Sequence, residues 1–197
     1  MKTLCNDGIM RTANRQPGLI LVFVFLLEAL SACKSAAKPL TAEEQARLDR
    51  IVRDRDFTMI AQWAEPTPDA SINAMASAGI FPPGSSPSRI NLGENANYFK
   101  MKGDSVFIQL PYYGERQVVK TYGQAEGITY EGLANDLKVN RNAERNYYDI
   151  DFSAKDRGEN FQCNLRLYGG QRALLTVQSN QRNQIRYDGN ITVDNDL

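Results

Sequence analysis

The sequence has no histidine, and only three of its 197 residues are cysteines. Without an imidazole the chain has neither a Ser-His-Asp triad nor a Cys-His pair, and no histidine can bind zinc. The commonest routes to nucleophilic and zinc-dependent catalysis are therefore excluded. Paired carboxylates are the enzymatic route that is left, and the sequence predicts no metal ion or other cofactor.

An excess of one charge is also absent, because 23 basic residues stand against 23 acidic ones. Residues 1–32 are predicted below to be a cleaved export signal, and without them the net charge is near −1. A balanced surface does not attract the phosphates of nucleic acid or an anionic membrane. We therefore expect no nucleic-acid partner.

Long apolar runs are missing too, since the longest, Leu19–Leu27, is too short to span a membrane. It follows Lys2, Arg11 and Arg15 and precedes small residues, which is the layout of an export signal. The segment ends in Leu30-Ser31-Ala32-Cys33, which resembles the bacterial lipobox. In that class the signal is cleaved before the cysteine, and the cysteine is acylated.

The lipobox resemblance implies a signal peptide at residues 1–32, cleavage between Ala32 and Cys33, and a palmitate-bearing Cys33 as the membrane anchor. Several acyl chains on one cysteine make anchoring durable. The alternatives are an ordinary signal cleaved at a nearby small residue, or a short anchor. The true start is either Met1 or Met10.

The mature chain is expected to contain one cysteine without a disulfide partner. Cys5 is removed with the signal and Cys33 carries lipid, so Cys163 has nothing to pair with inside the molecule. Cys163 falls on the predicted apolar face of a strand. We interpret it as a small buried hydrophobe rather than a reactive thiol.

The segment 33–56 is predicted to hold the lipidated cysteine, a short polar tether and a helix. Thr41 and Glu44 form a capping box, which predicts a helix over residues 41–55. Its narrow apolar stripe indicates that the helix either lies on the domain surface or serves partly as a stalk; the stripe consists of Leu48, Ile51 and Val52.

Residues 57–197 are predicted to form a β-rich domain, with Phe57–Ala64 as its first strand. The segment 66–91 holds five of the eight prolines, so no long regular element is expected there apart from a helical turn around Ile72–Ala76. Its apolar members favour a lid packed on the domain over a free linker; they are Ile72, Met75, Ile80 and Phe81.

The clearest strand pair is the hairpin from Tyr98 to Leu110, which turns at Gly103-Asp104. This turn sets Lys102 opposite Ser105 and brings four apolar side chains to one face of the hairpin: Phe99, Met101, Val106 and Ile108. Pro111 ends the second strand because it cannot donate to a ladder. Two strands alone are marginal, so further strands must pack around this hairpin.

Later segments alternate apolar and polar residues, as strands with one buried face do. A three-residue loop at Gly169–Gln171 places apolar residues opposite apolar residues on the buried face. It pairs Leu167 with Ala173, Leu165 with Leu175 and Cys163 with Val177. We predict a turn at Lys155–Asn160, a loop or edge segment at Asn135–Asn146, a strand pair from Gln117–Tyr122 and Gly127–Tyr130, and a last strand Ile185–Val193 with a turn or bulge at Asp188-Gly189. The predicted fold is mainly β: an antiparallel sandwich or partly open barrel of about 8–9 strands with one N-terminal helix.

Two groups of charged residues fall on the predicted wet faces. Asp149 and Asp151 lie two apart on one strand and point to the same side, which suits an acid–base or calcium site, although solvated strand charges explain them as well. Four arginines suggest a basic face, which nearby Asp149, Asp151 and Asp188 turn into a mixed surface; they are Arg166, Arg172, Arg182 and Arg186.

The candidate ligand contacts are Tyr112, Tyr113 and Phe81. The tyrosines beside Gly114 suit a stacking platform for a sugar or peptide, because aromatic faces give contact area at low entropic cost. The alternative is a tyrosine that caps the core while its hydroxyl binds a backbone group. Of the two, Tyr113 is expected to be the more exposed.

The order of these segments resembles a Bacteroidota lipoprotein family known as domain of unknown function 4251. The residues that carry the resemblance are Gly103–Val106, Leu110–Gly114, Gly127-Ile128, the strand around Ile150, and Gly170–Ser179 followed by Arg182, Ile185, Tyr187 and Gly189. The resemblance implies an exported antiparallel β domain and brings no activity, ligand or catalytic residue. In that group an acidic tract after the lipidated cysteine indicates display on the cell exterior. Lys34–Lys38 contains none, so we expect an outer-membrane anchor facing the periplasm.

These observations lead to a lipid-anchored cell-envelope protein that acts as a non-enzymatic binding or interaction module. Its partners are the membrane, through the lipid, and either an envelope protein or a small ligand. One alternative is a carrier that holds an apolar ligand between lid and sheet. A carboxylate-dependent hydrolase is a further alternative, supported by the spacing of Asp149 and Asp151.

Overall fold

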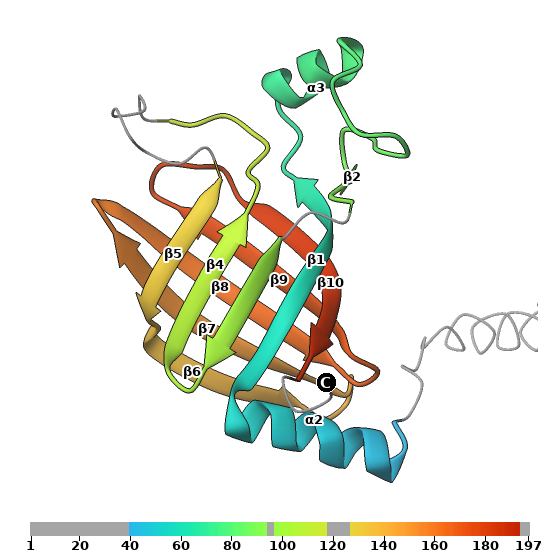
Figure 1. Ribbon diagram of the computed structural model, residues 1–197, viewed down its shortest axis with the longest axis vertical. Coiled ribbons are helices and arrows are strands. Elements are labelled where there is room, and N and C mark those ends of the chain that lie inside the picture. Colours follow the sequence, from blue (N-terminus) through green and yellow to red (C-terminus); the bar gives the residue numbers. More distant parts are fainter. Residues whose placement is uncertain (1–39, 94–96, 118–126, 194–197) are drawn as a thin grey trace, which may run out of the picture. The chain divides into compact units, whose positions relative to one another are not determined.

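The computed structural model describes residues 40–93, 97–117 and 127–193 (Figure 1). The predicted signal peptide, Ala32, Cys33 and most of the segment predicted as the strand Gln117–Tyr122 lie outside these ranges. The described chain forms the helices α2 (Ala42–Asp54) and α3 (Ala70–Ser77) and the strands β1 (Asp56–Pro66), β2 (Ile90–Asn91), β3 (Tyr98–Lys102), β4 (Ser105–Leu110), β5 (Ile128–Leu133), β6 (Asn135–Asn142), β7 (Tyr147–Asp156), β8 (Glu159–Tyr168), β9 (Arg172–Ser179) and β10 (Ile185–Thr192).

The strands form one antiparallel sheet in the order β5-β4-β3-β1-β10-β9-β8-β7-β6, and the short β2 pairs with β1. The sheet curls on itself until β5 approaches β7, next to the edge strand β6, so it is a nearly closed barrel rather than a sandwich (Figure 1). Curling leaves β5 and β6 as the edges of the main sheet. Each of the strands between them buries one face in the interior. The predicted mainly β fold with an N-terminal helix is confirmed.

The predicted hairpin register is confirmed, because Lys102 pairs with Ser105 across Gly103-Asp104. Gly103 has a φ of +59°, a backbone conformation that favours glycine. The register of β8 with β9 is confirmed as well, with Leu165 opposite Leu175 across the loop at Gly169–Gln171. In both hairpins a short turn and a buried face leave one register.

Two predicted details of the sheet are wrong, and a third lies outside the described residues. The β5 strand pairs with β4, whereas the predicted partner strand Gln117–Tyr122 lies outside the described residues except for Gln117. The turn between β7 and β8 is the two residues Arg157-Gly158, since both have positive φ and the strands therefore extend to the turn. The extra residue of the bulge is Gln62 in β1, opposite Asp188 and Gly189.

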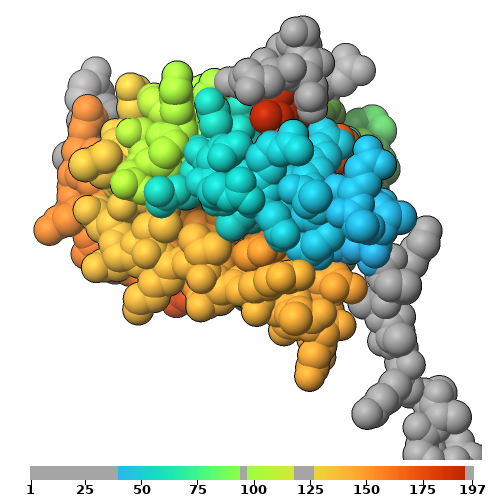
Figure 2. All heavy atoms as spheres, turned by 90° about the horizontal axis from the view of Figure 1, so that it is seen from below, coloured from blue at the N-terminus to red at the C-terminus, as the bar shows by residue number. Residues whose placement is uncertain are grey.

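The α2 helix lies across the lower end of the barrel (Figures 1 and 2). Thr41 and Glu44 make the predicted capping box, and the helix buries Leu48, Ile51 and Val52. The hydroxyl of Tyr148 on β7 donates to Asp49 Oδ1 at 2.8 Å, which fastens the helix to the barrel wall. These contacts favour the surface-helix interpretation over the stalk. Among the described residues no helix is long and apolar enough to cross a membrane.

Aromatic side chains fill the middle of the barrel. The ring of Phe99 on β3 contacts that of Phe57 on β1, with 6.3 Å between centroids, and that of Phe152 on β7, with 5.8 Å. Since β3 and β7 belong to different walls, these rings bridge the interior. Side chains of the protein therefore occupy this level of the barrel.

Candidate functional site

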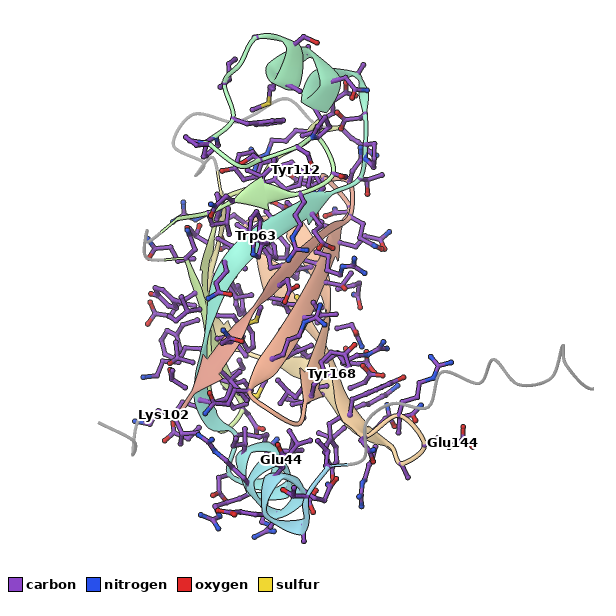
Figure 3. The ribbon with its side chains drawn as sticks, turned by 90° about the vertical axis from the view of Figure 1, so that its right-hand side faces the viewer. Glu44, Trp63, Lys102, Tyr112, Glu144 and Tyr168 are labelled. Atoms are coloured by element: carbon purple, nitrogen blue, oxygen red, sulfur yellow. The ribbon has the colours of Figure 1, made fainter. Side chains whose placement is uncertain are left out.

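Tyr112, one of the three residues predicted to contact a ligand, lies at the α3 end of the barrel (Figure 3). Asp69 caps α3 by accepting from the amide of Ile72 at 2.8 Å, and its other oxygen accepts from the amide of Glu115 at 3.2 Å. Ile72 is fully buried, whereas Ile80 is 64% exposed. The predicted lid is therefore held through Ile72, and the prediction that Ile80 packs on the domain is wrong.

Tyr112 is held from several sides. Its hydroxyl donates to the carbonyl oxygens of Glu115 at 3.1 Å and Asn183 at 3.3 Å, and the Arg182 guanidinium lies 5.2 Å from its ring centre. Burial raises the pKa of this tyrosine. Gly114 has a φ of +142°, and a Cβ there would lie 2.8 Å from the Tyr112 hydroxyl oxygen, which explains why glycine follows the tyrosines. Tyr112 thus matches the core-capping alternative.

Tyr113 and Phe81 meet edge to face, with 6.4 Å between ring centroids. Both are half-buried and pack against the main core, and burial raises the pKa of Tyr113. The structure therefore brings two of the three predicted contacts together. Because the contact is edge to face, the edge of one ring covers a face of the other, and that face is closed to a ligand.

A buried ion pair that sequence reasoning missed lies beneath Tyr112. The guanidinium of Arg182 binds Glu159 through two hydrogen bonds, of 2.8 and 3.2 Å, and each residue is 5% exposed. Arg182 also donates to the carbonyl oxygen of Gly127, and Ser179 donates to Glu159. The prediction that Arg182 lies on a solvent-exposed strand face is therefore wrong. Glu159 shares strand parity with Phe161 and Cys163, and this was the available signal that it points inward.

The carboxylates predicted for acid–base chemistry do not face each other as a pair. Asp149 accepts two hydrogen bonds from Arg166, of 2.8 and 3.2 Å. Asp151 accepts from the amide of Asn164 at 2.7 Å. Each carboxylate thus has its own neutralising or hydrogen-bonding partner, and they form no shared site. Among the described residues no three Cys, Asp or Glu side chains are placed to hold a metal ion.

The other arginines of the predicted basic face also have carboxylate partners. Arg172 binds Asp188 through two hydrogen bonds of 3.0 and 3.1 Å, which raise the pKa of Arg172. Arg186 binds Glu65. The outer face of β8–β10 is therefore a mixed surface of paired charges.

A groove that the sequence did not predict lies on the outer side of β3, β4 and β5. It has a volume of about 370 Å³ and is open to solvent. Most of its lining residues are outward-facing ones, which alternate with inward-facing residues along β3, β4 and β5. This alternation was the sequence signal for the groove. The residues that define this β4 groove are Tyr98, Phe107, Gln109, Thr129, Glu131 and Asp156.

A second hollow, of about 350 Å³, lies on the outer side of β6–β9. Amides and carboxylates line most of it, and its one aromatic residue, Phe152, is buried. The lining includes Asp136, Asp151, Gln162, Asn164, Thr176 and Gln178.

These features define a class of protein: an antiparallel barrel-like β domain with a filled interior, paired charges and grooves on its outer faces. The chain belongs to the family described as Domain of unknown function (DUF4251), whose model matches residues 40–191. The crystal structure of a DUF4251 family protein from Bacteroides eggerthii DSM 20697 is similar to this chain with a TM-score of 0.52 and 16% sequence identity, covering 79% of this chain and 91% of that one. At this identity the similarity shows the fold alone. No curated protein matches the sequence.

Proposed function

We propose that this protein is a lipid-anchored component of the cell envelope, held in the outer membrane by an acylated Cys33 and facing the periplasm, whose β domain is a non-enzymatic binding module. The lipobox Leu30–Cys33 stands shortly before residue 40, where the family match begins. Lipid and domain are therefore separated by a short tether only.

One observation carries the binding assignment. Asp149 of the predicted carboxylate pair is bound to Arg166, and the buried Glu159 is bound to Arg182, whereas the β4 groove is open. Paired charges stabilise and orient a surface, and a carboxylate that is held by a guanidinium is a poor base for removing a proton from a substrate. An open groove with polar and aromatic walls suits recognition.

The other two functions have less support. A carrier needs room inside the barrel, and the rings of Phe57, Phe99 and Phe152 occupy its middle. A hydrolase needs two carboxylates that converge on a bond, and the predicted pair does not provide them, because Asp149 and Asp151 have separate partners. Glu131 and Asp156 are another two carboxylates that share a site, the β4 groove.

Metabolic labelling with an alkyne analogue of palmitate tests the anchor. Wild-type protein should carry label and sediment with membranes, and Cys33→Ala should lose both properties while the domain still folds. Cys163→Ala is the matched control and should keep the label, because Cys163 is buried in the domain. Label that persists in Cys33→Ala would contradict the proposal, and so would digestion of the domain by protease added to intact cells.

A further inference from the structure

We infer that the β4 groove binds a neutral oligosaccharide, with the rings of Tyr98 and Phe107 stacking on the sugar and Gln109, Thr129 and Glu131 binding its hydroxyls. This inference rests on the proposed function, because it names the ligand class of the binding module. It moves the ligand away from Tyr112 and Tyr113 to another face of the barrel.

The strand register places these side chains side by side. Tyr98 pairs with Gln109, which pairs with Thr129, so the three form one row across β3, β4 and β5. Phe107 pairs with Glu131 in the next row of the same outward face. Tyr98 and Phe107 are therefore diagonal neighbours on adjacent strands, roughly 7–8 Å apart and within reach of one sugar residue.

The chemistry of this face suits a polyol. An aromatic ring covers the C–H face of a sugar, while amides, hydroxyls and carboxylates bind its hydroxyl groups. Four side chains of this lining form no hydrogen bond or ion pair within the described part of the chain: Tyr98, Gln109, Thr129 and Glu131. They are therefore available to a ligand without breaking an internal contact. A sheet face of this kind is a known way to bind oligosaccharides.

Charge narrows the choice to a neutral ligand. Glu131 and Asp156 both line the groove, and two cations lie beside them: Lys100, opposite Phe107 on β3, and Arg157, whose Nε lies 4.0 Å from Asp156 Oδ1. Two carboxylates balanced by two cations give the groove no net charge that would attract phosphate or another anionic ligand. A basic peptide is the competing ligand that the same charges allow, and its binding would weaken as salt screens the carboxylates.

The second hollow is a poorer site for the same ligand. Its amides and carboxylates include the Asp151–Asn164 pair, and its aromatic residue Phe152 is buried. Without an exposed ring, each hydrogen bond to a sugar replaces one to water and adds little. This hollow therefore supplies matched controls for the β4 groove.

The test uses the full-length lipoprotein, purified in a zwitterionic detergent without a sugar headgroup. Saturation-transfer NMR and calorimetry measure binding of hexasaccharides of glucose, mannose, xylose, galactose and N-acetylglucosamine, and of an oligo-arginine peptide. We expect at least one hexasaccharide to bind with little dependence on salt. Phe107→Ala should weaken it by at least about tenfold, which corresponds to about 1.4 kcal/mol. Gln109→Ala should also weaken it, whereas Gln178→Ala in the second hollow should not.

Thermal melts of each variant separate lost binding from lost folding, and Gln109→Ala keeps the test decisive if Phe107→Ala unfolds. The inference is overturned if no hexasaccharide binds, if only the peptide binds, or if Tyr113→Ala abolishes binding and the groove variants do not. A chain that carries palmitate on Cys33 and binds no sugar would overturn this inference and leave the proposed function standing.

Discussion

Replacing one partner of the Arg182–Glu159 pair should destabilise the domain far more than replacing both. Each residue is 5% exposed, and Glu159 accepts two hydrogen bonds from Arg182. Glu159→Leu leaves a buried guanidinium without its carboxylate, at a cost of about 3–5 kcal/mol. Arg182→Met keeps the apolar stem and leaves the carboxylate to Ser179 and Arg116, with a cost in the same range. The double variant removes both charges and should lose much less stability than either single variant.

Urea unfolding followed by far-UV circular dichroism measures these costs. For a slope of about 2 kcal/mol per molar urea, either single variant should lower the midpoint by roughly 2 M. Such a loss is a large fraction of the roughly 5–15 kcal/mol that a domain has in total. The control is the exposed pair Arg55–Asp104, where Asp104→Ala should cost less than about 1 kcal/mol. Single variants as stable as the wild type, or a double variant with the full additive loss, would show that the pair is not a coupled buried unit.

Three further predictions concern the core, the helix and the hairpin. Burial raises the pKa of Cys163 to about 12, so Ellman's reagent should modify this thiol only when urea unfolds the domain, and rapid reaction in native buffer would contradict its burial. The hydrogen bond from Tyr148 holds the pKa of Asp49 in the folded protein below its ordinary value. This bond therefore stabilises the fold at pH values above the pKa of Asp49 in the unfolded chain, and the stabilisation is lost as the pH falls through the pKa of Asp49 in the folded protein. Tyr148→Phe should therefore lower the melting temperature at pH 7 and flatten its decline between pH 5 and pH 3; an unchanged pH profile would contradict this. Deleting Gly103 and Asp104 should remove most of the domain's stability, and an unchanged melting temperature would count against the hairpin.

Local patterns predicted the parts of the fold that short segments specify. The capping box at Thr41 and Glu44 predicted the start of α2, and the turn at Gly103-Asp104 predicted the register of β3 with β4. The choice of a three-residue loop after Leu167 predicted the register of β8 with β9. In each case residues close in the chain meet each other, so their spacing carries the information.

The candidate site was harder to predict, because its residues come from distant segments. Arg182 and Glu159 are 23 residues apart and meet only because β8 and β9 bring their ends together. Tyr112 is held by a carbonyl 71 residues away. No spacing rule links such residues, so sequence reasoning read Arg182 as exposed and left the role of Tyr112 open.

The sequence by itself determined that the domain is mainly antiparallel β, which side of most strands is buried, and that a segment resembling a lipobox precedes it. These properties follow from the two-residue period of strands and from short motifs, which are local. The tertiary structure alone decided that β5 pairs with β4, that the sheet curls into a barrel, and that Tyr98, Phe107 and Glu131 share one groove. Such choices depend on which distant strands meet, and an alternating pattern suits every partner strand equally well.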